Sequence, residues 1–169
     1  MELQSAIAQL KTQGQAILPL ADGLSLEQAR WKPDEKSWSV LEVMNHLVDE
    51  EVLDFRRHLD HLLHTPKDPW PEIDPQGWVN SKHYNERQLD ATLAAFVAER
   101  EKSIAWLHTL KALNWDSAAA MPWGSLSAGD MLASWLAHDL LHLRQLIELR
   151  YALTESGSEP YRVEYAGGW

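Results

Sequence analysis

The segment "AGDMLASWLAHDLLHLRQLIELRYAL", residues 128–153, repeats its apolar side chains at the spacing of an amphipathic helix. On a helical wheel of about 100° per residue, His138 and His142 lie about 40° apart on the apolar face, which they share with Trp135 and Leu146. Two imidazoles one turn apart have the spacing of a metal chelate, and a pair of hydrogen-bonded structural histidines has the same spacing. A metal site therefore requires a third ligand from elsewhere in the chain.

Three other segments carry the same helical periodicity, at residues 3–21, 40–63 and 89–113. Ser39 with Glu42, and Ser127 with Asp130, have the spacing of capping boxes and predict where two of the four helices begin. No segment alternates as a strand does. The sequence thus predicts an all-α fold, a four-helix bundle.

The connection between the second and third predicted helices, residues 64–88, is long and contains four prolines. A connection of this length can cross from one end of a bundle to the other, which allows the helices it joins to run parallel. A short helical turn is expected within it, near residues 78–84.

Length and composition restrict the possible partners and location. A chain of 169 residues is long enough for one domain with a substantial core, and we expect a single domain, 1–169. Fifteen lysines and arginines against 25 aspartates and glutamates give a net charge of −10, which argues against nucleic acid and membrane partners. No apolar run suits a membrane span and the N-terminus lacks a signal peptide, so a cytoplasmic location is expected. The absence of cysteine excludes thiolate ligands and leaves nitrogen and oxygen donors.

His46, in "VMNHLVDEE", is the best candidate for the third ligand. It lies two turns into the second helix, at an axial level that roughly matches His138 and His142 if the two helices are antiparallel and only slightly less well if they are parallel. The wheel places it off the centre of the apolar stripe, so it is expected at an edge or opening of the bundle. Glu50 follows one turn later on the same side. It is a candidate for a fourth metal ligand, for the acceptor of a hydrogen bond from a ligand imidazole, or for a general base. A solvated helix carboxylate fits its position equally well.

The remaining polar and aromatic candidates have weaker patterns. His58, His61 and His64 step along the second helix and are expected to be solvated, whereas His83 and His108 are isolated. Asp139 falls within the apolar arc of its helix, where it is either hydrogen-bonded at the bundle edge or orients a ligand imidazole. Among nine tryptophans, two are assigned to the core and five to helix ends or connections that can wall a pocket: Trp106 and Trp115, and Trp31, Trp38, Trp70, Trp78 and Trp123.

Two segments, "KSWSVLEVMNHLVDEE" (36–51) and, nearly a hundred residues later, "HDLLHLRQLIELR" (138–150), together resemble the DinB-like (YfiT-like) superfamily of metal-dependent enzymes. The resemblance covers most of the chain. It implies a four-helix bundle of up-down-down-up topology, frequently a homodimer. It also implies that His46, His138 and His142 hold a divalent metal in a cleft.

The resemblance implies several activities, including transfer of low-molecular-weight thiols such as bacillithiol or mycothiol and a glutathione-dependent isomerisation. Three imidazoles leave a coordination position open, where a divalent ion can activate water or hold a thiolate. The leading hypothesis is a metal-dependent transferase of a low-molecular-weight thiol to a small-molecule substrate, with Glu50 as the catalytic residue. The alternatives are a metal-dependent hydrolase and a metal-binding or interaction bundle without turnover. The expected metal is zinc, nickel or iron. Affinity order favours copper and nickel over zinc for nitrogen ligands, but cellular availability usually decides which ion is bound.

Overall fold

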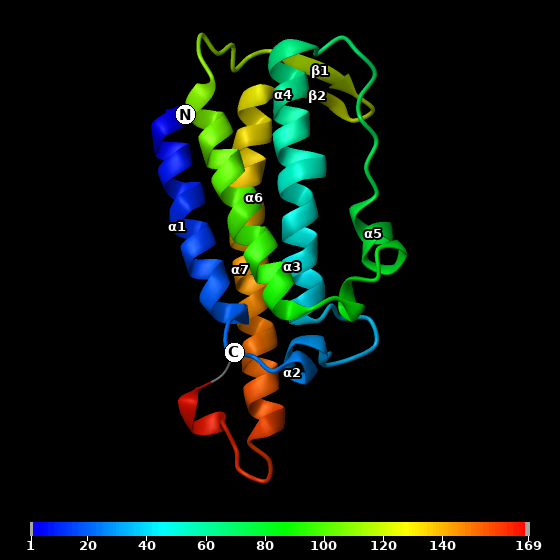
Figure 1. Ribbon diagram of the computed structural model, residues 1–169, viewed down its shortest axis with the longest axis vertical. Coiled ribbons are helices and arrows are strands. Elements are labelled where there is room, and N and C mark those ends of the chain that lie inside the picture. The colour runs from blue at the N-terminus through cyan, green and yellow to red at the C-terminus, as the bar shows by residue number, and fades with distance from the viewer. Residues whose placement is uncertain (1, 168–169) are drawn as a thin grey trace.

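The computed structural model describes residues 2–167, and helices make up most of them (Figure 1). The long helical segments of the bundle are α1 (Leu3–Ala21), α3 (Val40–Asp49) continued by α4 (Arg56–His64), α6 (Leu89–Thr109) and α7 (Ala128–Gly157). The shorter elements are α2 (Leu26–Arg30), α5 (Pro75–Ser81) and the 3-10 turns η2 (Tyr84–Glu86) and η3 (Glu164–Ala166). The prediction of a helical bundle is therefore confirmed.

The capping boxes predicted at two helix starts are present in the structure. The Ser39 hydroxyl accepts a hydrogen bond from the backbone N–H of Glu42, whose carboxylate accepts one from the N–H of Ser39. Ser127 and Asp130 form the same reciprocal pair at the start of α7. Each box satisfies two N–H groups that a helix terminus otherwise leaves unpaired.

The predicted helix 40–63 is continuous but not uniform. Between α3 and α4, residues Glu50–Phe55 form a π-helical segment, η1. A π-helix bonds i to i+5 and so contains an extra residue per turn, which rotates every later side chain about the helix axis. The segment begins at Glu50, directly after the turn that contains His46.

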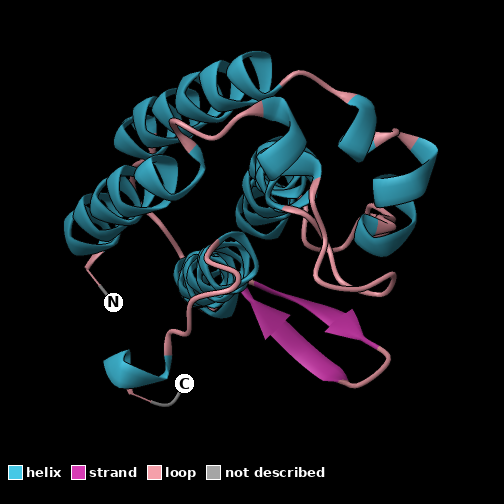
Figure 2. Cartoon of the chain, turned by 90° about the horizontal axis from the view of Figure 1, so that it is seen from below, coloured by secondary structure: helices cyan, strands magenta, loops and turns pink. Residues whose placement is uncertain are grey.

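The prediction that the chain has no strand is wrong. Ala118–Met121 (β1) and Gly124–Ser127 (β2) pair antiparallel, with Ala119 opposite Leu126. Figure 2 shows this hairpin projecting from one side of the helices. The predicted third helix also ends earlier than residue 113, at Thr109, because Leu110 is extended and Ala112 has a positive φ of 51°.

The connection from α4 to α6 runs along the outside of the bundle, with α5 standing on its path (Figure 1). It leaves α4 at one end of the bundle and reaches α6 at the end where α3 begins. The predicted helical turn within it corresponds to α5 and η2. This path places the start of α5 beside the middle of the molecule, where it contributes to the site described below.

The core consists of two clusters of buried apolar side chains, one toward each end of the bundle. Trp135, Leu132 and Phe55 are central to the first, and Trp106 and Trp115 pack against it partly buried, as predicted. The second cluster gathers apolar side chains from α1, α3, α6 and α7: Ile17, Met44, Phe96 and Leu146. Among residues 2–167, no helix has both the length and the apolar character that a membrane span needs.

Candidate metal centre

The three histidines predicted as ligands meet at one point between α3 and α7. Nε2 of His46 lies 3.2 Å from Nε2 of His138, which lies 3.1 Å from Nε2 of His142. Within residues 2–167 these are the side chains grouped closely enough to share a metal ion, with one ligand atom from each lying within 4.8 Å of the others. The HxxxH pair and the distant His46 are therefore brought together as the sequence predicted.

The spacing of the three nitrogens fits a first-row divalent ion. A tetrahedral zinc ion with Zn–N bonds of about 2.0–2.1 Å separates its nitrogen ligands by about 3.3–3.4 Å, and the Nε2 atoms lie only slightly closer, at 3.1 and 3.2 Å. Three nitrogens leave a tetrahedral ion at least one open position, as in catalytic rather than structural zinc sites.

A neighbouring amide orients one of the three rings. The side-chain oxygen of Gln145 lies 2.8 Å from Nδ1 of His142 and accepts a hydrogen bond from its N–H. The proton on Nδ1 leaves Nε2 of His142 with its lone pair directed at the other two histidines. Histidines that bind a metal through one ring nitrogen ordinarily donate a hydrogen bond from the other ring nitrogen in this way.

Burial keeps the imidazoles in the neutral form that binds metal. It lowers the pKa of His46 to about 3, an effect to which the neighbouring His142 adds. It lowers the pKa of His138 to about 2, again with a smaller contribution from His142, and it lowers the pKa of His142 as well. Neutral imidazole carries the lone pair that a metal requires, so no proton has to leave these rings before metal binds near neutral pH.

Glu50 lies beside the three histidines and is only 3% exposed, so the solvated-carboxylate interpretation is wrong. Its Oε1 lies 3.8 Å from Nδ1 of His46, and its Oε2 lies 3.9 Å from Nε2 of His138. Both distances exceed a hydrogen bond. Oε1 of Glu50 and Nδ1 of His46 are buried without a hydrogen-bond partner among the described residues. Burial, with the carboxyl groups of Asp54 and Asp49, raises the pKa of Glu50 to about 9.

The three histidines and Glu50 line a cleft of about 760 Å³. That volume is within the range of small-molecule sites, roughly 300–1,000 Å³. The indole of Trp38 lies parallel to the His142 ring, with centroids 6.4 Å apart, and meets His46 edge-on. The outer walls come from the loop before α3, the start of α5 and the adjoining face of α7: Lys36, Ser37, Pro75, Gln76, Gln145 and Glu148.

Of the five tryptophans predicted to border a pocket, Trp38 alone lines this cleft. Trp70 packs partly buried against the first core cluster, and Trp123 is 75% exposed in the hairpin turn. His46 is largely buried, but its ring lines the cleft, which is an opening of the bundle between α3 and α7.

The prediction that the later histidines of the second helix are solvated is wrong for two of the three. His58 is fully buried, with Nδ1 2.6 Å from the Asp54 carboxylate and Nε2 2.8 Å from the carbonyl oxygen of Pro71. Its ring stacks on Trp70 at 4.2 Å, and His61 meets the same indole edge-on. These contacts attach the long connection to α4.

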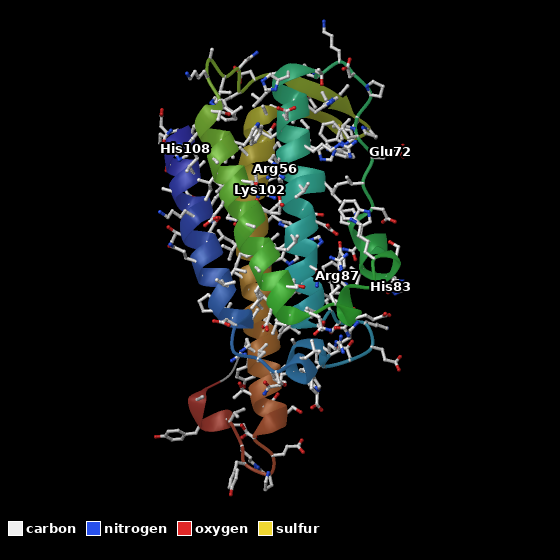
Figure 3. The ribbon with its side chains drawn as sticks, viewed as in Figure 1. Arg56, Glu72, His83, Arg87, Lys102 and His108 are labelled. Carbon is white, nitrogen blue, oxygen red and sulfur yellow. The ribbon has the colours of Figure 1, made fainter. Side chains whose placement is uncertain are left out.

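The remaining isolated histidines lie away from the cleft. His64 is exposed and lies 3.1 Å from Asp60. His83 and His108 lie on opposite sides of the molecule in Figure 3, and both are exposed. None of the three lines the cleft, so only three of the eight histidines contribute to the candidate centre.

Asp139 is hydrogen-bonded to an arginine rather than to a ligand imidazole, and it does not lie at the bundle edge. It is 1% exposed and accepts two hydrogen bonds from Arg100 of α6, at 2.6 and 2.9 Å. Sequence analysis missed Arg100 because a lone arginine in an amphipathic helix is ordinarily a surface residue.

The comparisons with known proteins agree with this architecture. A family model described as the DinB superfamily matches residues 9–146, and no curated protein matches the sequence. Among solved structures, YfiT from Bacillus subtilis is similar, with a TM-score of 0.77 and 17% identity over 90% of this chain and 88% of that chain. YfiT is described as "a probable metal-dependent hydrolase with an unusual four-helix bundle topology", and at this identity the likeness concerns the fold alone. Because the family match extends over most of its length, the chain belongs to the DinB superfamily.

Proposed function

We propose that this protein is a metal-dependent enzyme acting on a small molecule, with hydrolysis as the reaction that the geometry supports best. His46, His138 and His142 hold the ion, which is zinc, nickel or iron. The observation that carries the proposal is the convergence of three neutral imidazole nitrogens on a cleft that also contains the buried carboxyl group of Glu50, whose Oε1 has no hydrogen-bond partner among the described residues.

A divalent ion bound there supplies a Lewis acid and a water of lowered pKa. Glu50 is the catalytic residue. Burial favours its protonated form, and the positive charge of a bound ion would lower its pKa, so that the carboxylate could accept a proton from a nucleophile in the cleft and return it to a leaving group. Its Oε1 is available for that proton because it has no hydrogen-bond partner among the described residues. Trp38 forms an apolar wall that excludes water from one side of His46 and His142.

Metal analysis combined with a panel of small esters and amides tests this proposal. Protein purified without a nickel column is expected to contain about one divalent ion per chain, and a His138→Ala, His142→Ala double variant is expected to contain none while it remains helical. Hydrolysis of a panel member should need both the metal and Glu50. Unchanged metal content in the folded double variant would disprove the site, and a His46→Ala variant of unchanged affinity would disprove the third ligand.

Transfer of a low-molecular-weight thiol is the second candidate, supported by the family resemblance and by a cleft whose volume is within the range of small-molecule sites. A thiol bound at the open position is held as thiolate. Adding bacillithiol, mycothiol or glutathione to cobalt-substituted protein should then produce a sulfur-to-metal charge-transfer band. The chain has no cysteine, so any such band comes from the added thiol. No band with any of the three thiols would favour hydrolysis or a metal-binding bundle without turnover.

We also propose a domain organisation, a location, a topology and an oligomeric state for the chain. We expect one domain over residues 1–169, of which 1, 168 and 169 lie outside the described residues, and a cytoplasmic location. The path of the chain in Figure 1 supports the up-down-down-up topology. Exposed Leu140 and Leu141 on α7 support a homodimer. Light scattering of the purified chain tests the dimer, and a monomeric mass at micromolar concentration would contradict it.

A further inference from the structure

Three charged side chains are buried together behind the candidate metal centre. Arg100 of α6 is 5% exposed, and Glu51 of η1 and Asp139 of α7 are each 1% exposed. None of the three is used in the proposed chemistry, and none lines the cleft. Charged residues are almost never buried to this extent unless they are paired, so the contacts of Arg100 need an explanation.

Arg100 joins all four long helical segments of the bundle. Its Nε donates to Oε1 of Glu51 at 2.6 Å, and its Nη1 donates to the carbonyl oxygen of Leu10 in α1 at 2.8 Å. Nη1 and Nη2 donate to the two carboxylate oxygens of Asp139 at 2.6 and 2.9 Å. Gly14 of α1 lies alongside, where an added Cβ would approach the arginine stem to 3.5 Å.

Each carboxylate that Arg100 holds is adjacent in sequence to a residue of the site. Glu51 follows Glu50, and Asp139 follows His138. Adjacent residues on a helix point in directions about 100° apart, so holding one side chain fixes the direction of its neighbour. The two parallel bonds to Asp139 fix the rotation of α7 more firmly than a single bond would, because guanidinium and carboxylate are both planar.

A second line of contacts leads from the same cluster to the His138 ring. The indole N–H of Trp135 donates to Oε1 of Glu51 at 3.3 Å, and the indole stacks on Phe55 with centroids 5.6 Å apart. The Phe55 ring in turn packs against the His138 ring, with centroids 4.9 Å apart. The imidazole is therefore supported from behind by side chains that the buried charges hold in place.

The stability of the fold does not by itself explain why these three charged side chains are buried together. Buried ion pairs contribute little net free energy, because desolvation offsets their attraction, and apolar residues of similar volume frequently replace them without loss. Their best-attested role is to specify one register among several packing alternatives. Here the register concerns α7 relative to η1, the two elements that present His138 and Glu50.

We propose that Arg100 is a positioning residue for the metal centre, holding Glu51 and Asp139 so that Glu50 and His138 face the same point. This inference rests on the proposed function, because it assumes that the three histidines bind metal. Lysine at this position would keep the charge but would lose the planar fork that bonds both oxygens of Asp139.

Cobalt binding by an Arg100→Lys variant tests the assignment. Its affinity for cobalt should fall about 10-fold or more, as when outer-shell partners of metal ligands are lost, and the visible d–d spectrum of the bound ion should change. Arg56→Lys is the matched control. Arg56 joins α4 to α6 through Glu99 and Ser103 and is labelled in Figure 3. Because these hydrogen bonds of Arg56 lead to α6 and not to α7, its variant should lose stability only and keep the wild-type spectrum.

A folded Arg100→Lys variant with wild-type affinity and spectrum would overturn the positioning role while leaving the metal site intact. If that variant does not fold, Asp139→Asn, which conserves shape, is measured in the same way and should show the same loss and spectral change. A folded Asp139→Asn variant with wild-type affinity and spectrum would overturn the role equally. Wild-type protein that binds no cobalt would instead disprove the proposed function, and this inference with it.

Discussion

The side-chain oxygen of Gln145 lies 2.8 Å from Nδ1 of His142, one turn earlier on α7. The bond determines which nitrogen of His142 carries the proton, and so directs the lone pair of Nε2 toward His46 and His138. In the sequence HxxxHxxQ, the histidine spacing brings the two imidazoles together, and the glutamine orients the second of them.

Replacing Gln145 with leucine should therefore weaken metal binding by about 10- to 100-fold, the usual cost of losing an outer-shell partner. Competition with a chromophoric chelator measures the affinity. Gln76→Leu is the control, because Gln76 lines the same cleft from α5 without being hydrogen-bonded to a ligand histidine. Equal affinities of the two variants would contradict the orienting role of Gln145.

Glu50→Gln separates the roles left open for this residue. Its oxygens lie 3.8 Å from Nδ1 of His46 and 3.9 Å from Nε2 of His138, so we do not expect it to be a required ligand. The variant should retain about one cobalt ion per chain with an affinity within about 10-fold of wild type, while turnover on any substrate found falls by about 10²–10⁴-fold, the usual contribution of a general acid or base. Loss of the ion would make Glu50 a fourth ligand.

Local signals in the sequence were sufficient for much of the fold. Helical periodicity and the capping boxes at Ser39 and Ser127 depend on residues within a few positions of one another, so they can be identified without the fold. The hairpin could not, because each strand has four residues and β1 is "AAAM", a composition that favours helix. Its stability comes from pairing with β2 and from burial of Ala119.

The site was predictable to the extent that its geometry is that of a regular helix. His138 and His142 lie within one uninterrupted helix, so their shared face followed from their spacing. In a uniform helix, the nine positions from His46 to Phe55 would place the two side chains on opposite faces, about 180° apart. The intervening π-helix η1 rotates later residues by about 100°, which brings Phe55 to the His138 ring. Arg100 had no local signal, because Glu51 and Asp139 lie 49 and 39 residues away.

The capping box of α7 predicts a specific pH dependence. Hydrogen bonds from the Ser127 side chain, and then from its backbone, lower the pKa of Asp130 below its ordinary value of 3.8. The carboxylate therefore stabilises the fold above pH 3.8, and this contribution is lost as the pH falls through the lower folded-state pKa. Thermal melts should show Asp130→Asn less stable than wild type at pH 7, with the difference shrinking below pH 3.8. A difference that is constant from pH 7 to pH 3 would contradict this.

Removing the metal should leave the fold intact. The two core clusters pack without the ligand histidines, and Arg100 links the four helical segments independently of any ion, so the chelated protein should keep its helical circular dichroism. A ligand at about 100 times its Kd adds about 2.7 kcal/mol, which for a chain of this size corresponds to a fall in Tm of roughly 5–11 °C on chelation. The His138→Ala, His142→Ala variant should melt at the same temperature with and without chelator, which controls for effects of the chelator on the protein itself. Complete unfolding of the wild type on chelation would identify the ion as structural and argue against an open, catalytic centre.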